Sequence, residues 1–190
     1  MEGSPSTSEH SLYSSYREML LEHLFASAVM SHLWRNVVGR LEMLRSQVDD
    51  SGYDLVLEAN GFMRHIQLKS SHLRAKTARV GINAALQSKP SGCVIWLRFD
   101  PVTLALGPLL WFGGEPGKPL PDLESFKIAK RSTGNAMGVK PKRPITYVVP
   151  KARFQLLGSI PEVVTHLFGP KTDQIVRSSN LRQHVRRSGS

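Results

Sequence analysis

The dipeptide Asn60-Gly61 constrains the fold of this chain more than any other feature. Asn-Gly between alternating residues is the strongest short hairpin signal, because both central positions of a type I′ turn need a positive φ. If the loop consists of these two residues, counting outward places Asp54 directly opposite Gln67. Side chains alternate between the faces of a strand, so Asp54, Gln67 and Lys69 are predicted to share one face.

The predicted hairpin has an apolar face and a polar face. The face expected to pack on the core holds Tyr53, Leu55, Leu57, Ile66 and Leu68. The other face holds Asp54, Val56, His65, Gln67 and Lys69. Cross-strand neighbours lie about 5–8 Å apart, so a carboxylate, an amide oxygen and an ammonium are expected to gather there. The alternative is an edge hairpin whose polar face simply meets solvent.

The charge balance of the chain indicates the kind of partner. Lys and Arg number 25 against 15 Asp and Glu, which gives a formal net charge of +10. A strongly basic balance favours a polyanionic partner, above all nucleic acid. A generally basic, solvated surface is the alternative explanation.

No segment indicates export or insertion into a membrane. Apolar runs stay well short of the ~20 residues that a membrane-spanning helix needs. The Ser-rich start lacks a basic segment followed by an apolar run, so no secretory signal is expected. The single cysteine, Cys93, allows no internal disulfide and is predicted to be a buried small hydrophobe. These features are typical of a cytoplasmic protein.

One domain is predicted over residues 14–170, between a leader at 1–13 and a basic tail at 171–190 that are both expected to be disordered. Helices are predicted at 15–34 and 77–86, and strands at 40–48, in the two hairpin arms and at 93–99. The order helix, three strands, helix, strand indicates an α/β fold in which a central mixed sheet lies between helical layers.

Residues 100–170 are predicted to extend this core with further β and α elements. Strands are expected at 102–112, 145–149 and 154–157, and a helix opened by a capping box at 159–168. Three tryptophans lie in apolar contexts and are predicted to be core residues: Trp34, Trp96 and Trp111.

Glu22 is a candidate for chemistry because no local structural role explains it. Ser15-Tyr-Arg-Glu18 is predicted to be a capping box that starts the first helix, which would occupy Glu18. Glu22 lies one turn later, and its i+4 neighbour is Ala26, so no helical ion pair accounts for it. The alternative is an ordinary solvated helix glutamate.

The polar set of the hairpin suits a Mg²⁺ site, with Mn²⁺ as a substitute. Mg²⁺ needs only one or two carboxylates together with other oxygen ligands. Asp54 and Glu22 would supply the carboxylates. Gln67 would add an amide oxygen, and Leu68 its backbone carbonyl. Lys69 would orient or help to deprotonate an attacking water, or stabilise a developing oxyanion.

The pattern Gly52-Tyr-Asp54 … Gln67-Leu-Lys69, preceded by a helix bearing Glu22, resembles the PD-(D/E)xK nuclease superfamily. The resemblance implies a restriction-endonuclease-like fold with an αβββαβ core over residues 15–99. It also implies a metal-dependent endonuclease that hydrolyses DNA phosphodiesters, in restriction, repair or phage defence. The 13-residue separation of Asp54 from Gln67 is similar to that in Holliday-junction resolvases of the superfamily. The chain departs from the commonest motif at Gln67, where that motif has Glu or Asp, and at Tyr53, where it has proline.

Basic and polar residues outside the metal site are candidates for binding the nucleic-acid backbone. They are Lys130, Arg131, Lys140, Lys142, Arg143, His65 and Ser70. DNA is favoured over RNA as the partner, and a homodimer is one arrangement compatible with this function. Two alternatives remain: a non-catalytic nucleic-acid-binding module on the same fold, and a basic protein that binds an acidic partner.

Overall fold

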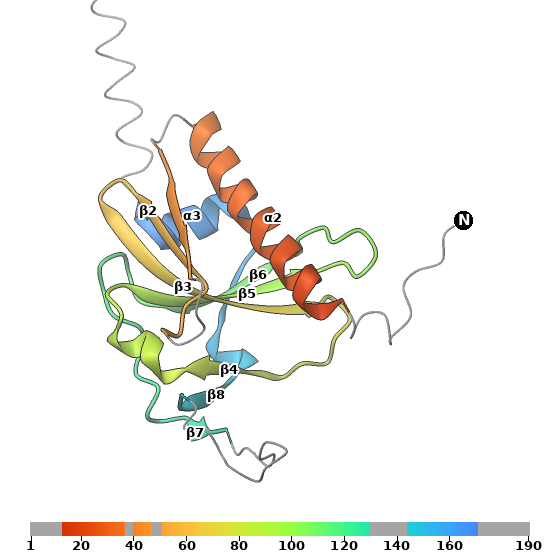
Figure 1. The fold of residues 1–190 in the computed structure, drawn as a ribbon, viewed down its shortest axis with the longest axis vertical. Helices are drawn as coiled ribbons and strands as arrows, with labels where there is room; N and C mark the ends of the chain where they lie inside the picture. Colours follow the sequence, from red (N-terminus) through yellow and green to blue (C-terminus); the bar gives the residue numbers. More distant parts are fainter. Residues whose placement is uncertain (1–12, 37–39, 47–50, 130–143, 171–190) are drawn as a thin grey trace, which may run out of the picture.

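Six strands form the central sheet of the computed structural model, which describes residues 13–36, 40–46, 51–129 and 144–170 (Figure 1). The strands are β1 (Glu42–Arg45), β2 (Leu55–Ala59), β3 (Phe62–His72), β5 (Gly92–Phe99), β6 (Leu109–Gly113) and β9 (Gln155–Leu157), in the spatial order β1-β2-β3-β5-β6-β9. The β3–β5 pair is parallel, and the other neighbours in this sheet are antiparallel. The sheet is therefore mixed, and the predicted α/β class is confirmed.

The hairpin predicted from Asn60-Gly61 joins β2 to β3. Asn60 has φ 54° and Gly61 has φ 78°, as a type I′ turn requires. Ala59 pairs with Phe62, and the register runs back to Leu55 opposite Ile66. The predicted register is therefore confirmed from Ala59 back to Leu55. The predicted place of Asp54 directly opposite Gln67 is not kept, because the N–H of Asp54 donates to the carbonyl of Ile66 at 2.9 Å, one residue out of step with that register.

Helices α2 (Ser14–Arg35) and α3 (Ile160–Phe168) pack against the same face of the sheet, and Figure 1 shows α2 running diagonally across it. Four large buried side chains of α2 recur every four residues, as on one face of a helix: Leu21, Phe25, Val29 and Leu33. They meet the apolar side of the hairpin and of β5, where Leu55, Leu57, Ile66, Cys93 and Ile95 are at most 1% exposed. This contact fixes α2, and hence Glu22, over the hairpin.

The opposite face of the sheet is covered by a second, smaller sheet (Figure 1). It consists of β4 (Arg79–Asn83), β8 (Thr146–Pro150) and β7 (Lys127–Ile128), in the order β4-β8-β7. A 3₁₀ helix, η1 (Ala84–Ser88), follows β4 directly, and a second one, η2 (Lys151–Arg153), follows β8. The predicted second helical layer is thus wrong: helices lie on one side of the central sheet and mainly β-structure on the other.

The predicted helix at 77–86 is wrong for an identifiable reason. Val80 and Ile82 are β-branched and alternate around Gly81, which favours a strand with a period of two. They pair with Val149 and Tyr147 of β8, which lie far along the chain. A strand and a 3₁₀ turn therefore replace the helix expected between β3 and β5.

Two capping boxes were expected, and the structure contains one of them. Helix α2 has Tyr13 at its N-cap without a side-chain hydrogen bond, so the box assigned to Ser15 and Glu18 is wrong. At α3, Ser159 Oγ accepts from the N–H of Glu162 at 3.4 Å, as expected.

The strand expected at 102–112 begins only at Leu109, because the preceding residues form a turn whose Asp100 carboxylate accepts backbone N–H groups.

The tryptophans differ in burial. Trp96 is 0% and Trp111 is 4% exposed, so both belong to the core as predicted. Trp34 is 84% exposed, which contradicts its assignment to the core. It lies in the last turn of α2, one residue past the buried stripe that ends at Leu33.

The predicted burial of Cys93 is confirmed, and burial raises the pKa of its thiol to about 12.

Arg64 is fully buried among apolar side chains, at 0% exposure. Its Nε donates to the carbonyl of Leu167 at 2.8 Å, and its second terminal nitrogen donates to the carbonyls of His166 at 2.6 Å and Gly114 at 3.0 Å. The guanidinium also lies 5.3 Å from the ring centre of Trp111. Arg64 therefore ties β3 to the C-terminal end of α3, where helix carbonyls lack partners within the helix.

Among the described helices, none is long and apolar enough to cross a membrane.

Candidate functional site

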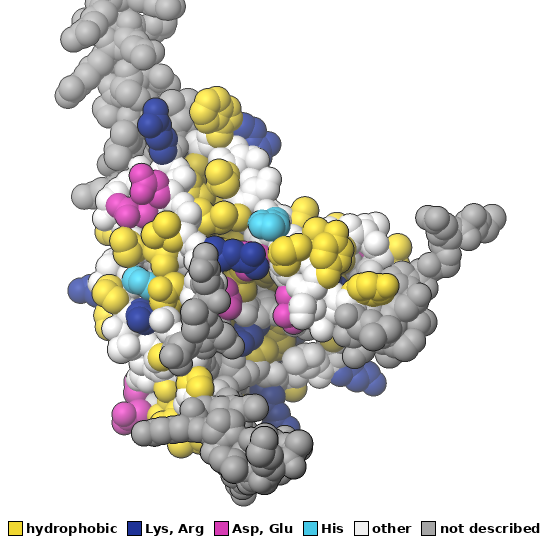
Figure 2. Space-filling model, viewed as in Figure 1, with side chains coloured by type: hydrophobic (Ala, Val, Ile, Leu, Met, Phe, Trp, Pro, Cys, Tyr) yellow, Lys and Arg dark blue, Asp and Glu magenta, His cyan; other side chains and the backbone are white. Residues whose placement is uncertain are grey.

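A pocket lies beside the part of β3 that extends beyond the start of β2 and is therefore not paired with β2. The β2–β3 register starts at Leu55 opposite Ile66, whereas β3 runs on to His72 with only β5 beside it. The N-terminal half of α2 covers this opening. The pocket is lined by Ser15, Glu18, Met19, Leu21, Glu22, Arg45, Asp54, Gln67, Leu68, Lys69, Ser70 and Leu97. In Figure 2, magenta and dark blue side chains meet beneath the helix, in the middle of the face shown.

The structure places the predicted catalytic residues Glu22, Asp54, Gln67 and Lys69 in this one pocket. They come from three elements, namely α2, the residue preceding β2, and β3. The hairpin register explains the approach of Asp54 to β3, and core packing of α2 explains the approach of Glu22. Their assignment to a metal site remains a prediction.

Asp54 is held by the strand edge that β2 leaves uncovered. Its Oδ2 accepts from the N–H of Leu68 at 2.6 Å, in the place where a longer β2 would have offered a backbone carbonyl. Within a strand, the N–H and C=O of one residue point to the same side. The carbonyl of Leu68 is therefore also directed toward the Asp54 side of β3, as the predicted role of that carbonyl requires.

Gln67 is buried, at 5% exposure, and links the two sheets. Its Oε1 accepts from the N–H of Asn83 at 3.1 Å, so the amide oxygen is already engaged at the end of β4. A carbonyl oxygen has two lone pairs, so one remains for a cation. Lys69 is half-buried on the same face of β3, opposite Trp96 of β5.

Glu22 is buried, at 8% exposure, and pairs with a cation that the sequence pattern did not single out. The Nε of Arg45, at the end of β1, lies 2.7 Å from Oε1 of Glu22. Burial raises the pKa of the Glu22 carboxyl above its usual range, Arg45 opposes that rise, and the nearby charge of Asp54 adds to it. Two carboxylates that repel each other in a partly desolvated pocket favour a nearby positive charge, which Arg45 supplies in this structure.

The raised pKa of Glu22 predicts a pH dependence of stability. A carboxyl whose pKa is higher in the folded than in the unfolded chain binds more protons when folded, in the interval between the two values. The free energy of unfolding is therefore expected to fall as pH rises from the ordinary glutamate pKa through the raised one. Urea unfolding of wild type and Glu22→Gln across this interval measures the effect. The stability of wild type relative to Glu22→Gln should decline with rising pH, and a constant or increasing difference contradicts the prediction.

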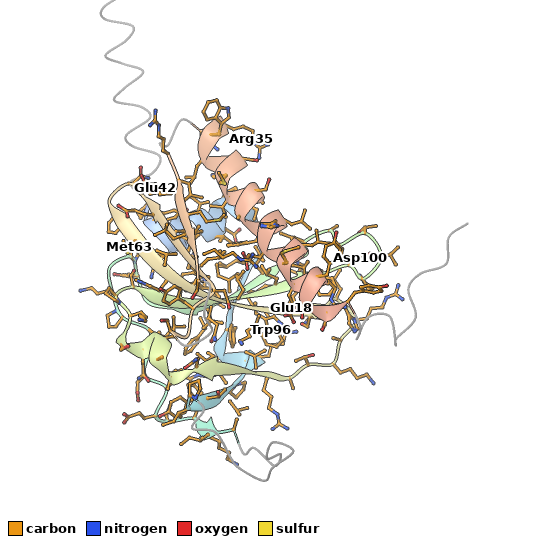
Figure 3. All side chains as sticks on the ribbon, in the orientation of Figure 1. Glu18, Arg35, Glu42, Met63, Trp96 and Asp100 are labelled. Carbon is orange, nitrogen blue, oxygen red and sulfur yellow. The ribbon has the colours of Figure 1, made fainter. Side chains whose placement is uncertain are left out.

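Glu18 and Arg45 are pocket residues that sequence reasoning missed. Glu18 was assigned to a cap that does not form, and it instead projects from the first turns of α2, where Figure 3 labels it, and lines the pocket. Arg45 lies within the strand predicted at 40–48, and the antiparallel pairing of β1 with β2 places it opposite Leu55, next to Asp54. That pairing joins two separate strands, so the sequence pattern alone does not place Arg45 beside the acids.

The predicted nucleic-acid-binding residues divide into three groups. Ser70 lines the pocket. His65 does not: its Nδ1 lies 2.8 Å from the carbonyl of Pro90, and its ring packs edge-on against Tyr53. The basic residues Lys130, Arg131, Lys140, Lys142 and Arg143 lie outside the described residues.

The pocket offers oxygen donors to a divalent cation. The described residues contain no group of three or more His, Cys, Asp or Glu side chains placed to hold a metal. Such a group is typical of zinc rather than of Mg²⁺, which takes one or two carboxylates and keeps several waters. Two carboxylates, a backbone carbonyl and an amide oxygen are hard oxygen donors, the ligand type that Mg²⁺ and Mn²⁺ take.

Comparison of the chain with models of protein families, with curated proteins and with solved structures found no match. A proposal for function therefore rests on the residues of the pocket and their geometry.

Proposed function

We propose that this pocket hydrolyses phosphodiester bonds of DNA with the help of a bound divalent cation, Mg²⁺ or Mn²⁺. The observation that carries the proposal is the meeting of Glu22 and Asp54 beside Lys69 in one pocket. The raised pKa of Glu22, to which Asp54 contributes, supports an affinity of the pair for positive charge. The +10 net charge of the chain supports a polyanionic substrate.

Glu22, Asp54 and the carbonyl of Leu68 would hold the cation, with Gln67 as a neutral ligand. A bound divalent cation supplies positive charge that offsets the charge of the scissile phosphate. Lys69 would donate a hydrogen bond to the attacking water or to the oxyanion that develops on the phosphate. The Arg45 guanidinium, with a side chain 49% exposed, would turn from Glu22 to the phosphate once the cation takes its place.

The proposed reaction is a simple hydrolysis. A water oxygen bonds to phosphorus, the bond from phosphorus to the leaving sugar oxygen breaks, and the proton of the water passes to solvent or to the leaving oxygen. We assign the site to the PD-(D/E)xK pattern, with Gln67 in the variable acidic position. The restriction-endonuclease-like fold belongs to this proposal as well, with β4 and η1 in place of the second core helix.

Cleavage assays test this function. Purified protein is incubated with supercoiled plasmid and with branched DNA, in Mg²⁺, in Mn²⁺ and in a chelator. We expect nicked, linear or resolved products with either cation and none with the chelator. Lack of cleavage of both substrates with either cation, by protein that binds DNA, argues against hydrolysis.

The ion pair of Glu22 with Arg45 favours one second candidate, a nucleic-acid-binding module without catalysis. In that case Arg45 permanently supplies the positive charge that the acids attract. This module would bind DNA with a steep salt dependence and without any response to divalent cations.

A further inference from the structure

The exposure of Trp34 is explained neither by core packing nor by the pocket. Tryptophan is normally well buried, yet Trp34 is 84% exposed, more than any other large apolar side chain among the described residues. It lies in the last turn of α2, at the opposite end of the helix from the pocket. An exposed indole presents a flat π surface to a ligand.

Trp34 lies in a groove whose lining combines apolar and positively charged side chains. The lining residues are Met30, Ser31, Leu33, Trp34, Arg35, Arg40 and Leu41. Two arginines and no acid are among these residues; Glu42 begins the neighbouring strand but does not line the groove. Figure 2 shows yellow side chains at the upper end of α2 with dark blue on either side, and Figure 3 labels Arg35 there.

This lining suits a ligand that offers both a flat ring and negative charge. Aromatic side chains stack on the face of any unpaired base, and arginine binds the adjoining phosphates. Bases within a duplex are stacked on one another and cannot reach an indole on the protein surface. We propose that the groove binds single-stranded nucleic acid by stacking a base on Trp34. This inference rests on nucleic acid being the substrate in the proposed function, and it adds that the substrate carries unpaired nucleotides.

The groove and the pocket are joined by continuous structural elements. About 18 Å of α2 separates Glu22 from Trp34, at 1.5 Å per residue. Strand β1 runs alongside, with Arg40 preceding it in the groove and Arg45 ending it in the pocket. A nucleic-acid strand anchored on Trp34 can therefore run along β1 from Arg40, past Glu42, to Arg45 at the pocket.

Binding of a labelled oligothymidylate in chelator and low salt tests the inference without requiring catalysis. Trp34→Ala should bind it about tenfold or more weakly than wild type, whereas Trp34→Phe, which keeps an aromatic face, should stay within about threefold. Leu24→Ala, at a 43% exposed position of α2 outside the groove, should match wild type. A blunt duplex should bind equally to wild type and Trp34→Ala.

Fluorescence gives an independent readout, because Trp96 and Trp111 are buried and Trp34 alone is exposed among the three tryptophans. Oligothymidylate should quench emission of wild type, and Trp34→Phe should lose this response. If Trp34→Ala binds oligothymidylate as tightly as wild type does, the inference is overturned. If, in addition, wild type is a dimer and Trp34→Ala is a monomer, the groove is an interface between copies of the chain. Metal-dependent cleavage retained in either case would leave the proposed hydrolysis standing.

Discussion

Asp54→Asn is expected to lower the rate of metal-dependent DNA cleavage by about a hundredfold or more. That factor is of the order seen when one group that stabilises transition-state charge is removed. The substitution removes one of the two carboxylates that line the pocket and whose charges interact. An amide oxygen still accepts the N–H of Leu68, so the local structure should persist. Initial rates on supercoiled plasmid at saturating Mg²⁺ measure the effect.

Asp100→Asn is the matched control for this substitution. Asp100 accepts N–H groups of Val102 and Thr103 in a turn and does not line the pocket, and asparagine can do the same. We expect it to cleave at the wild-type rate. The cleavage rate of Lys69→Ala should fall as that of Asp54→Asn does, because both residues line the pocket. Wild-type cleavage by both Asp54→Asn and Lys69→Ala would place the active site elsewhere.

Arg64→Met is expected to destabilise the fold by about 3 kcal/mol, through the loss of one buried and two partly buried hydrogen bonds to carbonyl oxygens. Methionine fills most of the volume, so the effect comes from the acceptors left without a donor rather than from a cavity. Arg64→Lys keeps the charge but not the planar guanidinium group. Its free energy of unfolding should lie between those of wild type and Arg64→Met. Urea unfolding monitored by circular dichroism measures all three.

Arg79→Met is the control for the loss of a positive charge. Arg79 is exposed at the start of β4, and its removal should change the free energy of unfolding by less than about 0.5 kcal/mol. If Arg64→Met were as stable as Arg79→Met, the buried guanidinium would not be what joins β3 to α3.

The parts of the fold that local chemistry decides could be predicted from the sequence. Asn60-Gly61 fixes the hairpin because only a type I′ turn uses two successive positive φ angles there. The register from Ala59 to Leu55 then follows by counting alone, and it brings the next residue, Asp54, beside β3. Ser159 and Glu162 cap α3 with side chains that are close in sequence. In each case, the deciding contacts span only a few residues.

The remaining parts depend on contacts between residues far apart in the sequence. Val80 and Ile82 form a strand because β8 offers a partner at Tyr147 and Val149. Arg64 is buried because the end of α3 supplies its acceptors. Trp34 directly follows Leu33, which is 1% exposed, but the two side chains differ by about 100° around the helix axis, and the side that carries Trp34 has no cover at the end of α2. Such partners cannot be identified from local periodicity.

Titration of the protein with Mn²⁺, followed by calorimetry, tests the central claim most directly. We expect saturable binding to wild type, weakened about tenfold or more in both Glu22→Gln and Asp54→Asn, because each removes one of the paired carboxylates. Glu124→Gln, at an exposed position outside the pocket, should bind as wild type does. The absence of saturable binding to wild type, or equal binding by all four proteins, would contradict the claim that Glu22 and Asp54 hold a divalent cation.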